Sequence, residues 1–306
     1  MPKFQDILGY EVLSTLGRGA KSTIYAVRDP KDGAQYAMKQ VEKASPSDQR
    51  FLDQAIAEHE VASRFDNPLL RHSFKLYRQR NFIRTTEVLV LMELVEGATL
   101  EQYDPPSMQT LIAVCSQVAQ GLGAMHSQKL VHADMKPNNV LVTADGNVKI
   151  IDFGQSCPVG TIKERIQGTP DYIAPEQVLK RAITAQTDVF NLGATIYWLL
   201  TRQHVPTLIP KGKPGLTLRS GDEKKCFAPI ELDPKVPPAL SSVVMDCIIT
   251  NPADRPRTMA EVISRLDIAA AQVNRRESET RSAPPTPDSD FDDADPEQML
   301  PHRNAS

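Results

Sequence analysis

The chain has 306 residues, of which 41% are hydrophobic and 24% charged, and its formal net charge is -3. This balance is ordinary for a folded protein of one large or two small domains, and the basic excess that would indicate nucleic acid or an anionic membrane is absent. Its four cysteines are scattered, which argues against a disulfide framework or a zinc site and favours a reducing, cytoplasmic location.

Neither the N-terminus nor the longest apolar stretch has the pattern of a targeting or membrane-spanning segment. The N-terminal residues 1–6 are not followed by an apolar run, so we expect no signal peptide. The longest apolar stretch, 189–200, contains Asn191 and is too short to span a bilayer.

The first part of the chain alternates apolar and polar residues in short runs, as strands with one buried face do. We expect strands at 10–16, 23–28, 35–41, 74–78 and 87–93, and one helix at 47–65 that ends before Asn67-Pro68. Helical periodicity then dominates, with helices expected at 106–127, 188–201, 239–249 and 259–271. These elements predict an α+β fold in which a small β-rich lobe and a larger α-helical lobe enclose a cleft.

Two segments differ in composition from their surroundings. Residues 202–238 are rich in Pro, Gly and Lys, which predicts a long irregular insertion. Residues 274–306 are rich in Pro, Ser and Asp, and we expect a disordered tail there because apolar residues are too few to form a core. Both segments are candidates for docking a partner protein.

A glycine-rich turn joins the first two expected strands. Its residues are Leu16, Gly17, Arg18, Gly19, Ala20, Lys21, Ser22, Thr23 and Ile24. Because glycine has no Cβ, its backbone N–H can approach a phosphate closely. Such a turn alone is far more often a simple hairpin, and Ser22 stands where G-x-G-x-x-G has its third glycine. The turn opens a strand rather than a helix, which excludes a Rossmann site.

Lys39 lies in the apolar strand Tyr36-Ala37-Met38-Lys39. Such a lysine either extends along the sheet to solvent or faces a cleft and pairs with phosphates, and the second role needs an anchoring carboxylate. Glu58 and Glu60 on the following helix are candidates, but residues two apart cannot share one helix face.

One short loop concentrates four polar residues, His132, Asp134, Lys136 and Asn139, directly before a strand-like run. A single Asp in a loop is usually a turn residue, but four such residues in one frame are not expected by chance. Asp152-Phe153-Gly154 follows the next apolar run. An acid that orients a hydroxyl, with an Asn and an Asp that bind metal, is what phosphoryl transfer from Mg-ATP requires.

Three further residues have structural interpretations. Glu176, in Ala174-Pro175-Glu176, is either an exposed acid at a helix start or the buried partner of Arg255. Asp188 either caps its own helix or holds the backbone of the Asp134 loop.

Taken together and in this order, the motifs resemble those of the eukaryotic-like (Hanks-type) serine/threonine protein kinase family, bacterial members included, over about residues 10–271. The segment Gly168-Thr169-Pro170 is typical of the serine/threonine branch. The resemblance implies a bilobal protein-kinase-like fold, with an N-lobe of about 10–94 and a C-lobe of about 98–271. It also implies ATP and Mg²⁺ as cofactors and proteins as substrates, with no nucleic acid and no membrane span.

The resemblance further implies a role for each site residue. Lys39 would hold the α- and β-phosphates, and Glu58, placed at the family's distance before Pro68, would hold Lys39. Asp134 would orient the substrate hydroxyl and accept its proton, and Lys136 would neutralise the γ-phosphate. Asn139 and Asp152 would bind Mg²⁺, and Thr169 would contact Asp134 and Lys136. The glycine turn would cover ATP, and the adenine would contact Leu16, Ile24, Ala37, the gatekeeper Met92, the hinge Glu93 to Val95, and Leu141.

One residue departs from the family pattern. Ala133 stands where an arginine usually binds a phosphate on the activation loop, 152–176, through paired donors. We therefore expect a serine/threonine kinase that does not depend on that contact. Two alternatives remain at this stage: a pseudokinase scaffold, and a kinase-fold enzyme that phosphorylates a small molecule.

Overall fold

The computed structural model describes residues 6–19, 21–206 and 226–282, and its first part is a five-stranded sheet. The strands are β1 (Glu11–Arg18), β2 (Ser22–Arg28), β3 (Gln35–Glu42), β4 (Ser73–Asn81) and β5 (Arg84–Glu93), in the spatial order β1-β2-β3-β5-β4. All neighbouring pairs are antiparallel. Each strand expected from the alternating pattern is present, and β4 and β5 extend further toward their shared turn than predicted.

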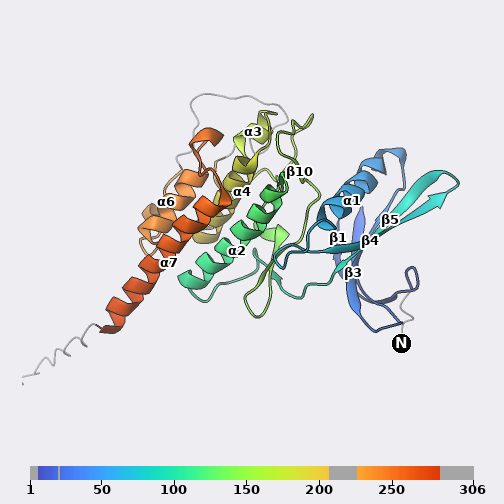
Figure 1. The fold of residues 1–306 in the computed structure, drawn as a ribbon, viewed down its shortest axis with the longest axis horizontal. Helices are drawn as coiled ribbons and strands as arrows, with labels where there is room; N and C mark the ends of the chain where they lie inside the picture. The colour runs from blue at the N-terminus through green and yellow to red at the C-terminus, as the bar shows by residue number, and fades with distance from the viewer. Residues whose placement is uncertain (1–5, 20, 207–225, 283–306) are drawn as a thin grey trace, which may run out of the picture.

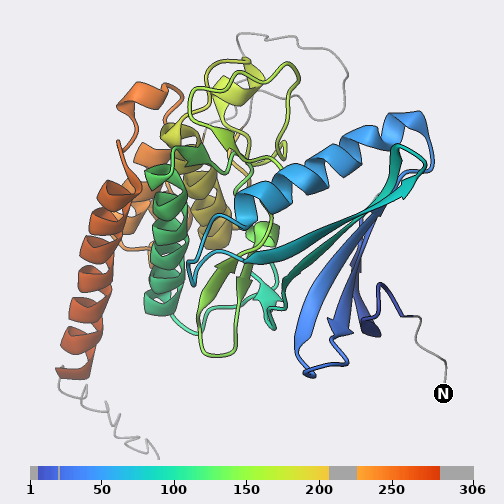
Figure 2. The same ribbon diagram turned by 45° about the vertical axis from the view of Figure 1, so that its right-hand side comes forward.

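The sheet has two apolar faces because successive side chains of a strand point to opposite sides. Met38, Leu89 and Leu91 lie on one face. Helix α1 (Gln49–Ala62) packs on the other, where its Leu52 and Ala55 join Val88 and Val90, and Figure 2 shows α1 lying along the sheet. The helix is shorter than the predicted 47–65 because a 3-10 turn (Pro46–Asp48) precedes it.

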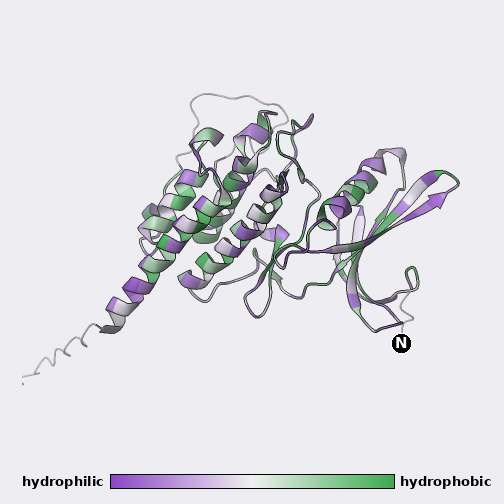
Figure 3. Ribbon diagram, in the orientation of Figure 1, coloured by the Kyte–Doolittle hydropathy of each residue, from purple (hydrophilic) through white to green (hydrophobic). Residues whose placement is uncertain are grey.

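The second part of the chain is mainly helical (Figure 1). Its long helices are α2 (Met108–Ser127), α4 (Ala185–Thr201), α6 (Pro238–Cys247) and α7 (Met259–Ser282), with the short helices α3 (Pro175–Val178) and α5 (Pro229–Leu232) between them. Helix α7 packs against α2 and α6, and α4 also contacts both. Green and purple segments alternate around these helices in Figure 3, as expected for helices with one buried face.

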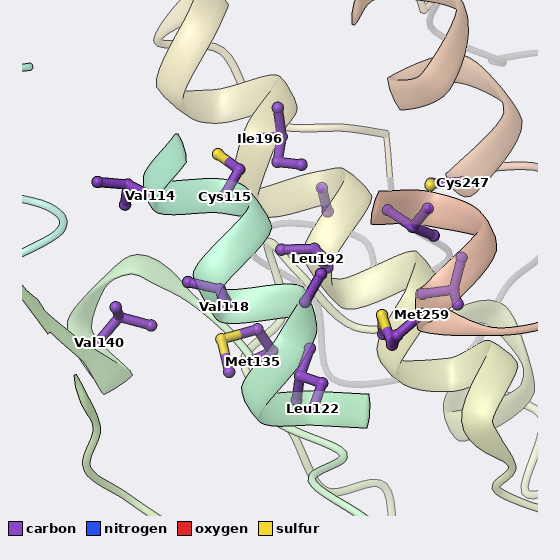
Figure 4. Close-up of a cluster of buried hydrophobic side chains, with 14 of the residues drawn as sticks. Val114, Cys115, Val118, Leu122, Met135, Val140, Leu192, Ile196, Cys247 and Met259 are labelled. Atoms are coloured by element: carbon purple, nitrogen blue, oxygen red, sulfur yellow. The ribbon is translucent and has the colours of Figure 1, made fainter. Parts of the chain in front are cut away.

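The core of the helical part is drawn in Figure 4. Residues of α2, α4, α6 and α7 meet there with Met135 of the loop after β7 and with Val140 of the strand 140–142. The helical residues are all buried: Val114, Cys115, Val118, Leu122, Leu192, Ile196, Cys247 and Met259. Each large side chain removed from water contributes about 1.5–3 kcal/mol. This packing makes the helical part a rigid support for the loops above it.

Two small ribbons hold the loops that carry the polar motifs. Strands β6 (Ala98–Thr99), β8 (Val140–Val142) and β9 (Val148–Ile150) form one ribbon, and β7 (Leu130–Val131) pairs with β10 (Cys157–Pro158) in the other. Residues 132–139 therefore connect β7 to β8, and 151–156 connect β9 to β10. The two loops lie side by side, since the Ile151 N–H donates to the Asn139 carbonyl.

Three expectations need correction or fall outside the described residues. The tail was predicted from 274, but α7 continues to Ser282. Arg275 and Glu279 are good helix formers spaced for an i,i+4 pair (3.7 Å), and no proline occurs between Pro256 and Pro284. Residues 283–306 lie outside the described part, as do 207–225 of the predicted insertion, whose remainder contains α5. Helix α4 starts at Ala185, earlier than the predicted 188. Among the described helices, none has the length and apolarity needed to cross a bilayer.

Candidate active site

The side chain of Lys39 on β3 meets that of Glu58 on α1 in a short ion pair. Glu58 is buried and Glu60 is exposed, so the structure selects Glu58. Burial works to lower the pKa of Lys39, but the charges of Glu58 and Asp152 outweigh it and the pKa lies above its ordinary value. The ammonium therefore stays charged inside the protein, as a group that holds phosphates must.

Arg71, which no sequence motif marks, also contacts the carboxylate of Glu58. Its Nη2 lies 3.3 Å from Glu58 Oε1, and its side chain is buried. A charged residue directly after the apolar pair Leu69-Leu70 was the available signal, but an arginine in a loop is usually exposed.

The loop between β7 and β8 gathers Asp134, Lys136 and Thr169. Asp134 Oδ1 accepts hydrogen bonds from the backbone N–H and the hydroxyl of Thr169, both at 2.9 Å. Lys136 Nζ donates to Thr169 Oγ1 (2.7 Å) and lies 3.3 Å from Asp134 Oδ2. Asn139 Nδ2 donates to the Asp134 carbonyl (2.8 Å), which leaves the amide oxygen as a ligand atom. The contacts expected for Thr169 are present.

Asp152 stands at the start of the second loop. Its Oδ1 accepts from the Gly154 N–H (2.8 Å), and the Phe153 side chain is buried below it. Burial works to raise the pKa of Asp152, yet Lys39 and the Gly154 N–H outweigh it and hold the pKa below its ordinary value. The loops are tied together by the Ile151 N–H, which donates to the Asn139 carbonyl (3.0 Å). Asn139 and Asp152 thus come from neighbouring strand ends.

Asp188 supports the first loop from below. Its carboxylate accepts from the N–H groups of His132 and Ala133 and from His126 Nε2, each at 2.8 Å. Helix α4 begins three residues earlier with Thr184 at the N-cap position, so the capping interpretation of Asp188 is wrong. His126, the third partner, was not selected from the sequence because it lies in the last turn of α2, where a histidine has no motif to mark it.

Glu176 and Arg255 form a buried, two-pronged ion pair. Arg255 Nη1 and Nη2 lie 2.8 and 3.0 Å from Glu176 Oε1 and Oε2, and the arginine side chain is fully buried. The same guanidinium donates to the carbonyls of Ile249, Thr250 and Gln186. The interpretation of Glu176 as an exposed acid is therefore wrong.

Ala133 is fully buried against Val131, Cys157 and Ile183. Its φ of 61° places it in the left-handed region, and its carbonyl accepts from Gln177 Nε2 (2.8 Å). Ala133 thus makes an apolar contact with Cys157 of β10.

A lysine within the activation loop itself holds that loop together. Lys163 Nζ donates to the Gln155 carbonyl (2.7 Å), and burial lowers the pKa of Lys163. The Thr161 hydroxyl donates to the Pro158 carbonyl (2.7 Å).

The glycine turn lies between β1 and β2, with Leu16, Gly17 and Arg18 on β1 and Ser22, Thr23 and Ile24 on β2. Gly19 N–H donates to the Ser22 carbonyl (2.7 Å), and a Cβ on Gly19 would lie 2.8 Å from Ser22 Oγ, which would have to rotate away. Lys21 Nζ lies 3.4 Å from Asp48 Oδ1, and its side chain is exposed. Ala20 lies outside the described residues.

The residues expected around adenine come from β1, β2, β3, β5 and β8 and from the segment after β5. Ala37 and Met92 are buried partners across β3 and β5, and Ile24 is the β2 partner of Lys39. Leu141 is half-buried on β8. Glu93 binds Lys149 (2.7 Å) and the His72 N–H (3.1 Å) through its side chain, and half-buried Val95 follows. Leu16 is 52% exposed, as a residue at the rim would be.

Oxygen atoms of Asn139 and Asp152 suit Mg²⁺, which binds few protein ligands and takes the rest from phosphate and water. In the described residues no group of three or more His, Cys, Asp or Glu forms a separate metal cage. The donor set is therefore compatible with a magnesium ion that arrives with its nucleotide.

Comparison with known proteins agrees with this arrangement. Residues 10–265 match the family described as protein kinase domain. The serine/threonine-protein kinase PknL of Mycobacterium tuberculosis is 32% identical over 258 residues, which are 80% of this chain and 62% of PknL. PknA from the same species is 27% identical and covers 90% of this chain and 64% of its own length. The chain thus spans less than two thirds of these relatives.

A solved structure shares the fold. The kinase domain of PknI from Mycobacterium tuberculosis, solved as a double mutant, superposes with a TM-score of 0.66 at 23% identity, covering 88% of this chain and 99% of that one. The expected bilobal architecture, with a β-rich first part and a helical second part, is confirmed.

Proposed function

The chain belongs to the protein kinase family, and from this premise we propose that it transfers the γ-phosphate of Mg-ATP to serine or threonine hydroxyls of protein substrates. The observation that carries the proposal is the cluster of Asp134, Lys136 and Thr169 beside Asn139. We assign the kinase domain to residues 10–271, with its lobes divided between 94 and 98.

Asp134 acts as the group that orients and deprotonates the substrate hydroxyl. Its Oδ1 is held by two hydrogen bonds from Thr169, so its rotamer is set before substrate arrives. The remaining oxygen, Oδ2, is the one that accepts the hydroxyl proton. Lys136, already 3.3 Å from that oxygen, places positive charge where the transferred group gains negative charge.

Bound Mg-ATP supplies the phosphoryl group and the cation that neutralises it. Lys39, held by Glu58, would bind the α- and β-phosphates, and Asn139 with Asp152 would hold the metal. Because Asp152 is ionised well below neutral pH, its carboxylate is ready to bind the cation. The glycine turn would cover the phosphates.

We further propose that activity does not depend on an activation-loop phosphate bound beside Asp134. Ala133 offers no donor to such a phosphate, and apolar contacts with Cys157 and Ile183 take its place. The Thr161 hydroxyl is used within its own turn. Alanine replacements of Thr161 and Ser156 should therefore retain turnover, whereas Thr169→Ala should lose it through Asp134. Loss of activity in Thr161→Ala that a phosphate mimic restores would contradict the proposal.

One experiment tests the catalytic assignment against the scaffold and small-molecule alternatives. The protein is incubated with radiolabelled Mg-ATP and a generic protein substrate beside Asp134→Asn and Lys39→Met. Label in the protein substrate with wild type alone supports the proposal. No transfer with wild type favours a scaffold, and ATP turnover without protein labelling favours a small-molecule substrate.

A further inference from the structure

Arg71 lies in the segment between α1 and β4, outside every motif named above. Its side chain is 11% exposed, and Nη2 reaches Glu58 Oε1 at 3.3 Å. The other oxygen of Glu58 contacts Lys39. One buried carboxylate is therefore shared by two cations, one from each side, and neither cation alone satisfies both of its oxygens.

The backbone of Arg71 is attached to the strand that leads to Asp152. Its N–H donates to the Ile150 carbonyl (2.9 Å), and the Ile150 N–H donates to the Leu69 carbonyl (2.8 Å). These bonds form a short parallel bridge between Leu70, which is buried, and Ile150 of β9. Arg71 is thus fixed to the strand that ends two residues before Asp152, whereas Glu58 belongs to α1 on the sheet. The ion pair joins the two parts of the molecule.

Charges of both signs act on one another around Arg71. Half-buried Lys39 is the second cation, and the anions that act on Arg71 are buried Glu58 and half-buried Asp152 and Glu93. An isolated buried carboxylate is costly, and removal of one partner from a buried group of charges leaves the others unpaired. Without Arg71, Glu58 Oε1 would lose its cationic partner, and Lys39 would be the remaining cation in contact with the carboxylate.

We propose that Arg71 is a positioning residue that locks Glu58, and through it Lys39, in register with Asp152. This inference rests on the proposed function, since it assigns Arg71 to the nucleotide-binding arrangement of the same site. The link between α1 and the Asp152 strand is built into the protein and needs no phosphate on the activation loop.

The test compares Arg71→Met, Arg71→Lys and the exposed neighbour Arg64→Met as a matched control. Arg71→Met should lower kcat/KM for ATP on the order of tenfold, as loss of a supporting partner around a site does. The loss should fall mainly on KM, because Lys39 binds the phosphates. Arg71→Lys, which keeps the charge, should recover most of it, and Arg64→Met should match wild type.

A second comparison shows whether Arg71 acts through Glu58. In a Glu58→Gln background, Arg71→Met should cost less than about twofold, because coupled residues are not additive. Equal losses in both backgrounds would overturn the inference, as would an Arg71→Met variant that matches wild type.

ADP affinity measured by calorimetry without metal separates this inference from the proposed function. It should fall about tenfold in Arg71→Met even if the wild type transferred no phosphate to protein, and unchanged affinity would overturn the inference. If Arg71→Met does not fold, the Arg71→Lys variant is compared with Arg64→Met instead. An ADP affinity of Arg71→Lys that is about tenfold below that of Arg64→Met would contradict a role of the positive charge.

Discussion

Replacing Glu176 by glutamine should destabilise the helical part strongly. The change keeps the shape of the side chain but leaves the fully buried Arg255 guanidinium without its counter-charge. Removing one partner of a buried pair costs about 3–5 kcal/mol. We expect the lower end, about 3 kcal/mol, because the carbonyls of Ile249, Thr250 and Gln186 still accept from the guanidinium. At roughly 2–4 °C per kcal/mol, the midpoint of thermal unfolding should fall by about 6–12 °C.

The single tryptophan makes the assay direct. Trp198 lies on α4 within the same helical part, so its fluorescence during urea denaturation follows that part. The matched control is Asp246→Asn, which breaks an ion pair of equal length, 2.8 Å to Arg265, whose side chains are 42% and 35% exposed. An exposed pair contributes only about 0–1 kcal/mol.

The apolar double variant completes the comparison. Glu176→Met combined with Arg255→Met leaves no buried charge unpaired and should be more stable than Glu176→Gln alone. If Glu176→Gln loses no more stability than Asp246→Asn, the reasoning that burial makes this pair costly to break is refuted.

Three further predictions rest on burial and close packing. Burial raises the pKa of the Cys115 and Cys247 thiols to about 12. Iodoacetamide at neutral pH should therefore label half-buried Cys226 before either of them. Equal labelling of the three thiols, measured by mass spectrometry, would contradict this prediction. A Cβ on Gly193 would lie 2.5 Å from Cys247 Cβ, so Gly193→Ala should lower the free energy of unfolding by about 1–3 kcal/mol. Urea titration measures this change, and an unchanged midpoint of unfolding would contradict the prediction. The folded-state pKa of Lys39 lies above the ordinary 10.5, so its charge contributes stability that is fully present below 10.5 and is lost as pH rises through the folded-state value. The difference in unfolding free energy between wild type and Lys39→Met should therefore stay constant near neutral pH and change only in strong alkali; a change near pH 7 would show that another group is responsible.

Local patterns predicted most of the architecture, because alternation and helical spacing depend on near neighbours in the chain. The strands around Lys39 and the helix that bears Glu58 are examples. Boundaries were less well predicted: α7 continues past 274 because its last residues favour helix although they bury little.

The order and spacing of Lys39, Asp134, Asn139 and Asp152 along the chain are enough to predict which polar groups serve phosphoryl transfer. The surroundings of these groups depend on contacts that form only when the chain folds. Arg71 gains its partners through a bridge between Leu70 and Ile150, and Ala133 is enclosed by Cys157 and Ile183. Such contacts join residues far apart in the chain, and no short-range pattern records them; they arise when the sheet, the two ribbons and the helices pack together and bury their charges in pairs.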